Sequence, residues 1–347
     1  MRSSVQAENT TDFFEQHPDV QVERLTAAGH EVLQHWGIDD AEISLIKYRE
    51  NAVFQVEHAT GRHALRMHRT GYHSDAELHS ELQWMQALDE SGIYVPNVVP
   101  TNAGDMFALM EGEGLPGPIQ TDLFEWIDGE QMGSVEEGIA DEASVAGIFT
   151  TIGEIAARVH NQASDWILPA GFMRHAWDAD GLAGENPFWG QFWKLESATK
   201  SESELMLRAK KAIHEELGQL PKERDSYSLI HADFAPENLL VDGDIIRLID
   251  FDDAGFGWHL FEIATSLYFV RGEPFYDLAF ESLIAGYREY RPLSDRHLEK
   301  LPLFNLARAM TYVGWVHTRQ ETETAQEMTP MLLGMACEVA EDYLAKN

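Results

Sequence analysis

The chain has 347 residues, of which 44% are apolar and 24% charged, a composition typical of a globular protein with about two domains or lobes. Its 59 acidic and 25 basic side chains give a net charge of −34, which argues against nucleic acid and anionic membranes as partners. The sequence has no run of about 18 apolar residues, so no membrane span is expected.

The segment Met1–Thr11 is polar and lacks the apolar core of a secretory signal. A single cysteine, Cys337, excludes an intramolecular disulfide and suits a reducing compartment. We therefore predict a cytoplasmic protein. The acidity has two interpretations, attraction of cationic substrates or general solubility, and general solubility accounts for most of it.

The first third of the chain predicts a small lobe rich in β-structure. Apolar residues at helical spacing indicate an amphipathic helix over 20–36 and a second helix over 74–88. Alternating or continuous apolar runs indicate strands at 43–48, 53–57, 63–68, 107–110 and 122–127. The order of three strands, helix and two strands predicts a five-stranded antiparallel sheet with one crossing helix.

After Asp128-Gly129 the pattern becomes mainly helical. Helices are predicted over 145–160, 200–217, 262–270, 275–287, 297–315 and 331–344. Residues 165–200 are rich in aromatic side chains, and Trp177, Trp189 and Trp193 either belong to the core or line a pocket for a cation. The core interpretation is favoured for all three.

Residues 228–253 contain the candidate catalytic and metal-binding side chains. An apolar strand, Ser228–Ile230, leads to Asp233 and Asn238, and a second apolar run leads to Asp250. If these strands form a hairpin, two carboxylates and one amide face a common point. Oxygen ligands of this kind suit Mg²⁺, and a carboxylate free of the metal can accept a proton from an attacking hydroxyl. The stretch predicts a phosphotransfer site.

Four motifs, in this stretch and on either side of it, give the chain a family likeness. His231–Asn238 resembles the catalytic loop H-G-D-x-x-x-x-N, and Ile249–Gly255 resembles I-D-W/F-E/D-x-A. Gly257–Ala264 is similar to G-D-P-x-x-D-L-A, and Ile152–His160 resembles the helix ending in A-x-x-H. The chain thus resembles the aminoglycoside phosphotransferase, choline kinase and homoserine kinase superfamily from about Ile43 to Trp315.

The resemblance implies an α+β, protein-kinase-like fold with two lobes. Residues 1–126 would form the β-rich nucleotide-binding lobe, and residues 127–347 the helical lobe with the catalytic loop and the acceptor site. Asp233 would orient and deprotonate the acceptor hydroxyl, while Asn238 and Asp250 would hold Mg²⁺ against the phosphates of ATP.

The resemblance also implies a nucleotide site in the first lobe. Arg66 lies where the family has a phosphate-anchoring lysine, and Glu81 would be its ion-pair partner. Asn51 lies in the turn expected to cover the phosphates. The adenine edge would meet the backbone of three consecutive residues, Glu125, Trp126 and Ile127.

Three departures from the family pattern leave alternatives open. Arg66 replaces lysine and is either a phosphate ligand or a surface arginine of a strand. The first hairpin, Glu50-Asn51-Ala52, lacks a glycine-rich loop. Glu262 replaces an aspartate and either braces the catalytic loop or is an acid favoured at a helix N-terminus.

The predicted function is ATP-dependent transfer of the γ-phosphoryl group to a hydroxyl of a small molecule. The acidic balance favours an amine-bearing acceptor such as an aminoglycoside, an amino alcohol or a hydroxy amino acid. A protein Ser/Thr kinase of the same fold is one alternative, although no A-P-E motif follows Asp250. A nucleotide-binding scaffold with impaired catalysis is another, suggested by Arg66. The absence of G-x-x-x-x-G-K-[S/T] excludes a P-loop enzyme.

Overall fold

The computed structural model describes residues 13–133 and 142–346. These residues divide into two compact units, and the predicted α+β fold class is confirmed. The first unit contains the described residues up to Glu90, Val95–Asp128 and Gly171–Met173. The second contains Ser91–Tyr94 and the described remainder of the chain. Within the described residues no helix combines the length and the apolar character needed to cross a membrane.

The first unit is built on a five-stranded antiparallel sheet, as predicted, and the structure gives its strand order as β1-β2-β3-β5-β4. Its strands are β1 (Ala41–Tyr48), β2 (Ala52–His58), β3 (Gly61–Met67), β4 (Ala108–Met110) and β5 (Ile119–Glu125). β5 begins three residues before the predicted strand because Ile119 pairs with Met110 and Thr121 with Met67. The start of β5 was missed in the sequence because Gln120 and Thr121 are polar and interrupt the apolar pattern.

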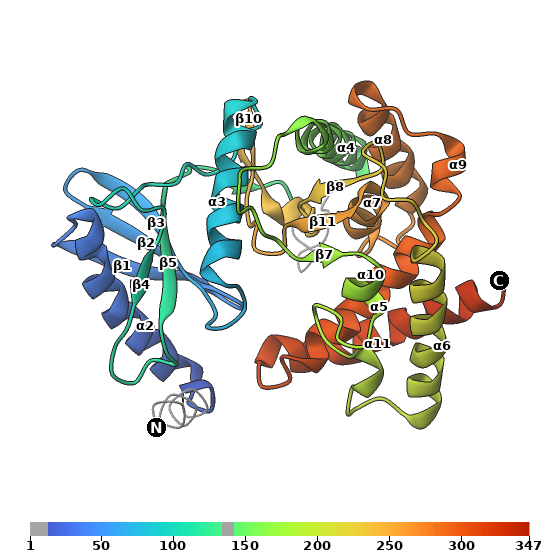
Figure 1. Cartoon of the computed structure of the whole chain (residues 1–347), viewed down its shortest axis with the longest axis horizontal. Helices are drawn as coiled ribbons and strands as arrows, with labels where there is room; N and C mark the ends of the chain where they lie inside the picture. Colours follow the sequence, from blue (N-terminus) through green and yellow to red (C-terminus); the bar gives the residue numbers. More distant parts are fainter. Residues whose placement is uncertain (1–12, 134–141, 347) are drawn as a thin grey trace. The chain divides into compact units, whose positions relative to one another are not determined.

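One face of this sheet is covered by α2 (Pro18–Val32), as Figure 1 shows. Leu25, Ala28 and Val32 of the helix form one apolar core with sheet residues that include Phe54 and Leu65. The predicted helix over 20–36 is α-helical only to Val32, since its last turn tightens into a 3-10 helix (Leu33–Trp36). The left-handed Gly37 (φ 72°) ends it there.

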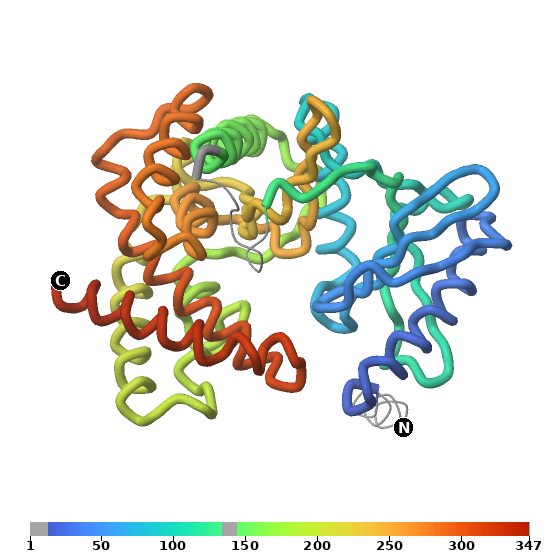
Figure 2. Tube along the Cα trace, turned by 180° about the vertical axis from the view of Figure 1, so that it is seen from behind, coloured from blue at the N-terminus to red at the C-terminus, as the bar shows by residue number. Residues whose placement is uncertain are grey.

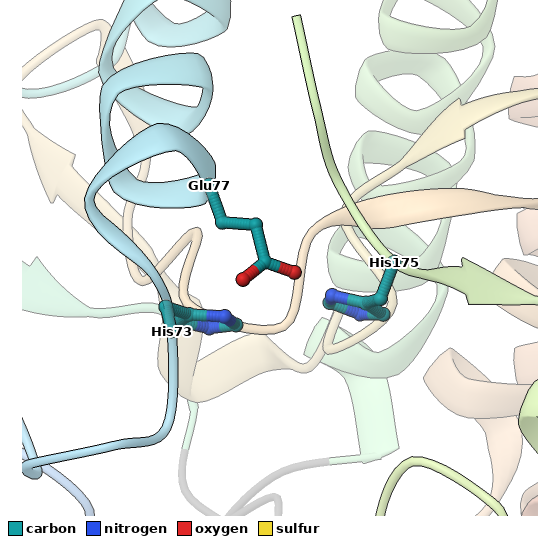
Figure 3. Close-up of side chains that lie close together, drawn as sticks. All are labelled: His73, Glu77 and His175. Carbon is teal, nitrogen blue, oxygen red and sulfur yellow. The ribbon is translucent and has the colours of Figure 1, made fainter.

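The second helix of this unit, α3 (Asp75–Glu90), starts with a capping box. The Glu77 carboxylate accepts hydrogen bonds from the backbone N–H and the hydroxyl of Ser74, at 2.9 and 2.8 Å. Figure 3 labels Glu77 in the first turn of α3 and His73 just before the helix. The cap explains why the predicted helix over 74–88 is found almost unchanged.

The second unit contains two small sheets, and here the predicted hairpin is wrong. β8 (Tyr227–Ile230) does not pair with β10 (Ile245–Leu248); it pairs with β11 (Gly255–Trp258). β10 forms its hairpin with β9 (Leu239–Asp242) through a turn in which Gly243 has φ 60°. The remaining strands are β6 (Glu130–Gln131), which pairs with β9, and β7 (Ala176–Trp177), which pairs with β11. His175, also labelled in Figure 3, precedes β7 and stacks on Phe188 with ring centroids 3.7 Å apart.

Helices make up most of the second unit. They are α4 (Glu142–Asp165), α5 (Ala179–Ala183), α6 (Lys200–Leu217), α7 (His259–Leu267), α8 (Tyr276–Tyr290), α9 (Asp295–Leu298), α10 (Leu301–His317) and α11 (Glu323–Leu344). The helix predicted over 297–315 is interrupted between α9 and α10, where Pro302 enters the first turn of α10 and cannot donate a backbone hydrogen bond.

The helices α4 and α8 cross in close contact, and Figure 2 shows them side by side. A Cβ atom on Gly153 would lie 2.1 Å from the carbonyl oxygen of Leu283, and one on Gly286 would lie 2.1 Å from that of Thr150. Only glycine fits at both positions. The crossing fixes the position of α4, which carries His160, a neighbour of Glu262.

Candidate active site

The catalytic loop follows β8 and is anchored by His231. This side chain is fully buried, and its Nε2 lies 2.9 Å from the carbonyl oxygen of Ile249. The contact ties the loop that carries Asp233 to the segment that carries Asp250. His231 is therefore a brace of this loop.

Glu262, in the first turn of α7, binds the same loop through both carboxylate oxygens. Oε1 accepts a hydrogen bond from the backbone N–H of His231 at 2.8 Å, and Oε2 accepts one from that of Ala232 at 2.7 Å. Burial raises the pKa of Glu262, while His231 and the two backbone donors oppose that rise. Of the two interpretations open from the sequence, the loop brace describes these contacts.

These bonds hold Ala232 in a conformation that is unusual for a residue with a side chain. Its φ is 64°, in the left-handed region that favours glycine, and the related motif H-G-D has glycine there. Asp250 has a similar φ of 67°. Both candidate carboxylates are therefore linked to a left-handed residue: Asp233 follows Ala232, and Asp250 is itself left-handed. Backbone strain of this kind is common in active sites.

His160 contacts both Tyr287 and Glu262. Its Nδ1 lies 2.8 Å from the Tyr287 hydroxyl, and its Nε2 lies 3.5 Å from Glu262 Oε1. Burial holds the pKa of His160 well below its usual value, so the imidazole is neutral at pH 7. His259 stacks on it with ring centroids 4.1 Å apart.

Asp233 is partly exposed, with 26% of its side chain accessible, and donors hold both of its carboxylate oxygens. The Asn238 amide donates to Oδ2 and to the backbone carbonyl of Asp233, both at 2.8 Å. Arg308 Nη2 donates to Oδ1 at 3.1 Å. Arg308 was missed by the sequence interpretation, because the only local signal is Tyr312 one helical turn further on, and Asp233 lies 75 residues away.

Asn238 and Asp250, the predicted metal ligands, are brought together by the backbone. The N–H of Ile249 donates to the carbonyl oxygen of Asn238 at 2.9 Å, and Asp250 is the next residue. The amide of Asn238 uses its nitrogen to bind Asp233, which leaves its oxygen for a cation. One amide oxygen and one carboxylate are a donor set that fits Mg²⁺, whose remaining ligands are usually waters and phosphates.

Arg174, just before β7, holds the turn after Asp250 and was missed by the sequence interpretation. Its guanidinium donates to the carbonyl oxygens of Asp252 and Ala254, both at 2.5 Å. Nothing in the local sequence around Arg174 marks it, because its partners lie 78 and 80 residues away.

Two of the tryptophans belong to the core of this unit. Trp177 is fully buried, and Trp189 is 5% exposed. The indole of Trp177 donates to the backbone carbonyl of Asp253 at 2.8 Å, and that of Trp189 donates to the Asp253 carboxylate at 3.0 Å. Trp193 is half-buried, with Lys210 over its ring at 4.6 Å.

In the first unit Arg66 is 7% exposed, so its interpretation as a surface arginine is wrong. Its Nη2 donates to Glu81 Oε1 at 2.8 Å, the pair expected from the sequence. It also binds both carboxylate oxygens of Asp122, which lies directly opposite on β5. Asp122 was missed because only the register of β3 and β5 brings it to Arg66.

Asp122 is fully buried and also contacts His68, whose Nε2 lies 3.1 Å from Oδ2. Burial alone would raise the pKa of Asp122, but Arg66 and His68 hold it below its ordinary value. The carboxylate is therefore ionised at neutral pH.

The other predicted nucleotide contacts have structural partners of their own. The side-chain oxygen of Asn51 accepts a hydrogen bond from the Arg69 N–H at 3.2 Å. Glu125, the last residue of β5, donates its N–H to the carbonyl oxygen of Asn97 at 2.9 Å, so that donor is not available to adenine. The Trp126 indole donates to Asp128 at 3.0 Å, and Ile127 is half-buried. Their roles towards a nucleotide stay predictions.

Comparison with known proteins agrees with this arrangement. Residues 43–293 match the phosphotransferase enzyme family. The structure superimposes on that of a microcompartment-associated aminopropanol kinase with a TM-score of 0.81 and 31% identity, over 92% of this chain and 98% of the other. Amicoumacin kinase from Bacillus subtilis is 25% identical over 317 residues, 88% of each chain. A structure of amicoumacin kinase hAmiN in complex with AMP-PNP and Ca²⁺ has a TM-score of 0.73 and 22% identity, over 94% of this chain and 96% of that one.

An aspartate oriented on a strained loop, followed by an amide and a second carboxylate, is the arrangement expected in a phosphotransferase of the kinase type. The chain belongs to the phosphotransferase enzyme family, and the family and the enzyme class predicted from the sequence are confirmed.

Proposed function

We propose that the protein transfers the γ-phosphoryl group of ATP to the hydroxyl of a small amino alcohol. The observation that carries the proposal is the Asp233 carboxylate, which is held at both oxygens and still partly exposed. A carboxylate fixed in this way can orient a hydroxyl and accept its proton.

Asn238 and Asp250 are the proposed ligands of Mg²⁺. The bound cation would neutralise charge on the transferred phosphoryl group. The backbone N–H of Ile249, the residue before Asp250, donates to the carbonyl oxygen of Asn238, and this proximity of the two residues supports a shared ion. Arg174 and His231 keep this segment in place.

Arg66 is the proposed phosphate anchor of the first unit. Its guanidinium is fixed by Glu81 and Asp122, which supports a preorganised cation, and arginine binds phosphate oxygens well. Asn51 in the first hairpin and the segment Glu125–Ile127 are the proposed contacts for the phosphates and for adenine.

Two independent observations support an acceptor that carries an amine. The relative with 31% identity is an aminopropanol kinase, and the chain carries a net charge of −34. The protein Ser/Thr kinase and scaffold alternatives have less support, since the relatives are named for small molecules and Asp233, Asn238 and Asp250 are all present. The single cysteine supports a cytoplasmic location.

A coupled ADP-release assay tests the proposal. The purified protein with Mg²⁺ and ATP is incubated with amino alcohols such as aminopropanol, with hydroxylated amino acids, with aminoglycosides and with mixed peptides. We expect the highest kcat/KM with a small amino alcohol. Turnover only with peptides would favour the protein kinase alternative, and no turnover with any acceptor would reject the proposed function.

A further inference from the structure

We propose that Arg308 is the positioning residue for Asp233, and that it holds the base in one orientation without exchanging a proton. The inference rests on the proposed function, because it assigns a role in that reaction. Arg308 lies in the middle of α10, and its Nη2 donates to Asp233 Oδ1 at 3.1 Å and to the Tyr312 hydroxyl at 2.7 Å.

The surroundings of Arg308 are unusual for a cation. The side chain is fully buried, and its guanidinium carbon lies 4.1 Å from the ring centroid of Tyr312, 4.9 Å from that of Trp189 and 5.5 Å from that of Phe261. Within the part of the chain that the structure describes, Nε and Nη1 have no hydrogen-bond partner. Aromatic faces compensate only part of the loss of water.

Such an arrangement is a poor source of stability. Each buried donor without a partner costs about 1–3 kcal/mol, and apolar residues of similar size often replace a buried ion pair without loss of stability. Because Arg308 is unfavourable for folding and contacts the proposed base, we attribute its presence to a role in the reaction. Asp233 is partly exposed, so it does not itself require a buried counter-charge.

The geometry explains what Arg308 adds. Asn238 holds Oδ2 of Asp233 from the catalytic loop itself, and Arg308 holds Oδ1 from a separate helix. Two donors on the two oxygens prevent rotation of the carboxylate about its Cβ–Cγ bond. Orientation of this kind is worth a large factor, since a displacement of about 1 Å can lower a rate about 100-fold.

Arg308 takes no part in the transfer of the acceptor's hydroxyl proton. In the proposed reaction the acceptor oxygen forms a bond to the γ-phosphorus, the bond from that phosphorus to the β–γ bridging oxygen breaks, and ADP leaves with its electron pair. The hydroxyl proton passes to Asp233. Burial opposes the charge of Arg308, but Tyr312 and Asp233 hold the pKa of the guanidinium above its usual value, so it stays a cation throughout.

Arg308→Met, Arg308→Lys and a control, Arg291→Met, test the proposal. Arg291 is also a buried arginine, but it binds Asn161 and Ser164. For Arg308→Met we expect kcat to fall roughly 10- to 100-fold, with an unchanged KM for ATP and a melting temperature close to that of the wild type. Arg308→Lys should restore part of kcat, and Arg291→Met should keep it even where it lowers the melting temperature.

A double-mutant cycle separates positioning from a general structural role. In an Asp233→Asn background, Arg308→Met should cause no further loss of kcat, because the group that it positions has already been replaced. An equal loss in both backgrounds, or near-normal kcat in folded Arg308→Met, would overturn the inference. A wild-type protein that phosphorylates no acceptor would instead reject the proposed function on which it rests.

Discussion

Asp122 lies directly across the β3–β5 ladder from Arg66 and accepts hydrogen bonds from its Nε and Nη2, at 3.0 and 2.7 Å. With Glu81 at 2.8 Å, two carboxylates surround one guanidinium. These contacts fix the plane of the Arg66 guanidinium. A lysine, with a single nitrogen, could not make this pair of contacts.

Asp122→Asn should lower the free energy of unfolding by about 3 kcal/mol at pH 7, because it removes one charge of a buried ion pair. The pKa of Asp122 is lower in the folded protein than in the unfolded chain, so its contribution is present above the unfolded pKa. It is lost as the pH falls through the folded pKa. Urea unfolding of both proteins from pH 7 down into the acid range measures this, and the gap should narrow at acid pH. A gap that is constant across the range would contradict the ion pair.

Glu262→Gln should lower kcat roughly 10-fold while the protein stays folded. Glutamine has one acceptor oxygen, whereas Glu262 accepts from the N–H groups of both His231 and Ala232. One of these donors would then face an amide N–H₂. Steady-state kinetics with saturating ATP measures the effect, with Glu281→Gln on the exposed face of α8 as the control. An unchanged kcat in Glu262→Gln would mean that the loop does not need this support.

Ala232→Gly should raise the free energy of unfolding by about 0.5–1 kcal/mol. The left-handed conformation of Ala232, at φ 64°, costs about 1–2 kcal/mol for a residue with a side chain, and the greater freedom of glycine in the unfolded chain offsets part of the gain. Ala254→Gly is the matched control: Ala254 is also fully buried but does not have a positive φ, so this change should destabilise. Denaturant titration compares the two variants. Destabilisation in both would show that the loop does not store this strain.

The sequence was informative wherever function and structure are encoded locally. The spacing of His231, Asp233 and Asn238 predicted that they share one loop, and in the structure they contact one another within it. The strands of the first unit were predicted because each has its own apolar pattern and neighbouring strands are joined by short turns.

Contacts between distant segments were not predictable in this way. Asp122 is 56 residues from Arg66, and Arg308 is 75 residues from Asp233. The hairpin expected between β8 and β10 was wrong for the same reason. β8 pairs with β11, and nothing within either strand specifies that pairing. Such partners follow from the packed fold and not from a motif.

Replacement of Asp233 tests the central claim most directly. For Asp233→Ala we predict a fall in kcat of roughly 10²–10⁴ with the best acceptor, because the base is lost, while the affinity for Mg²⁺ and ATP measured by calorimetry is retained. Asp244→Ala, an exposed change in the β9–β10 turn, is the control and should keep full activity. Near-normal turnover in folded Asp233→Ala would contradict the assignment of Asp233 as the group that orients and deprotonates the acceptor.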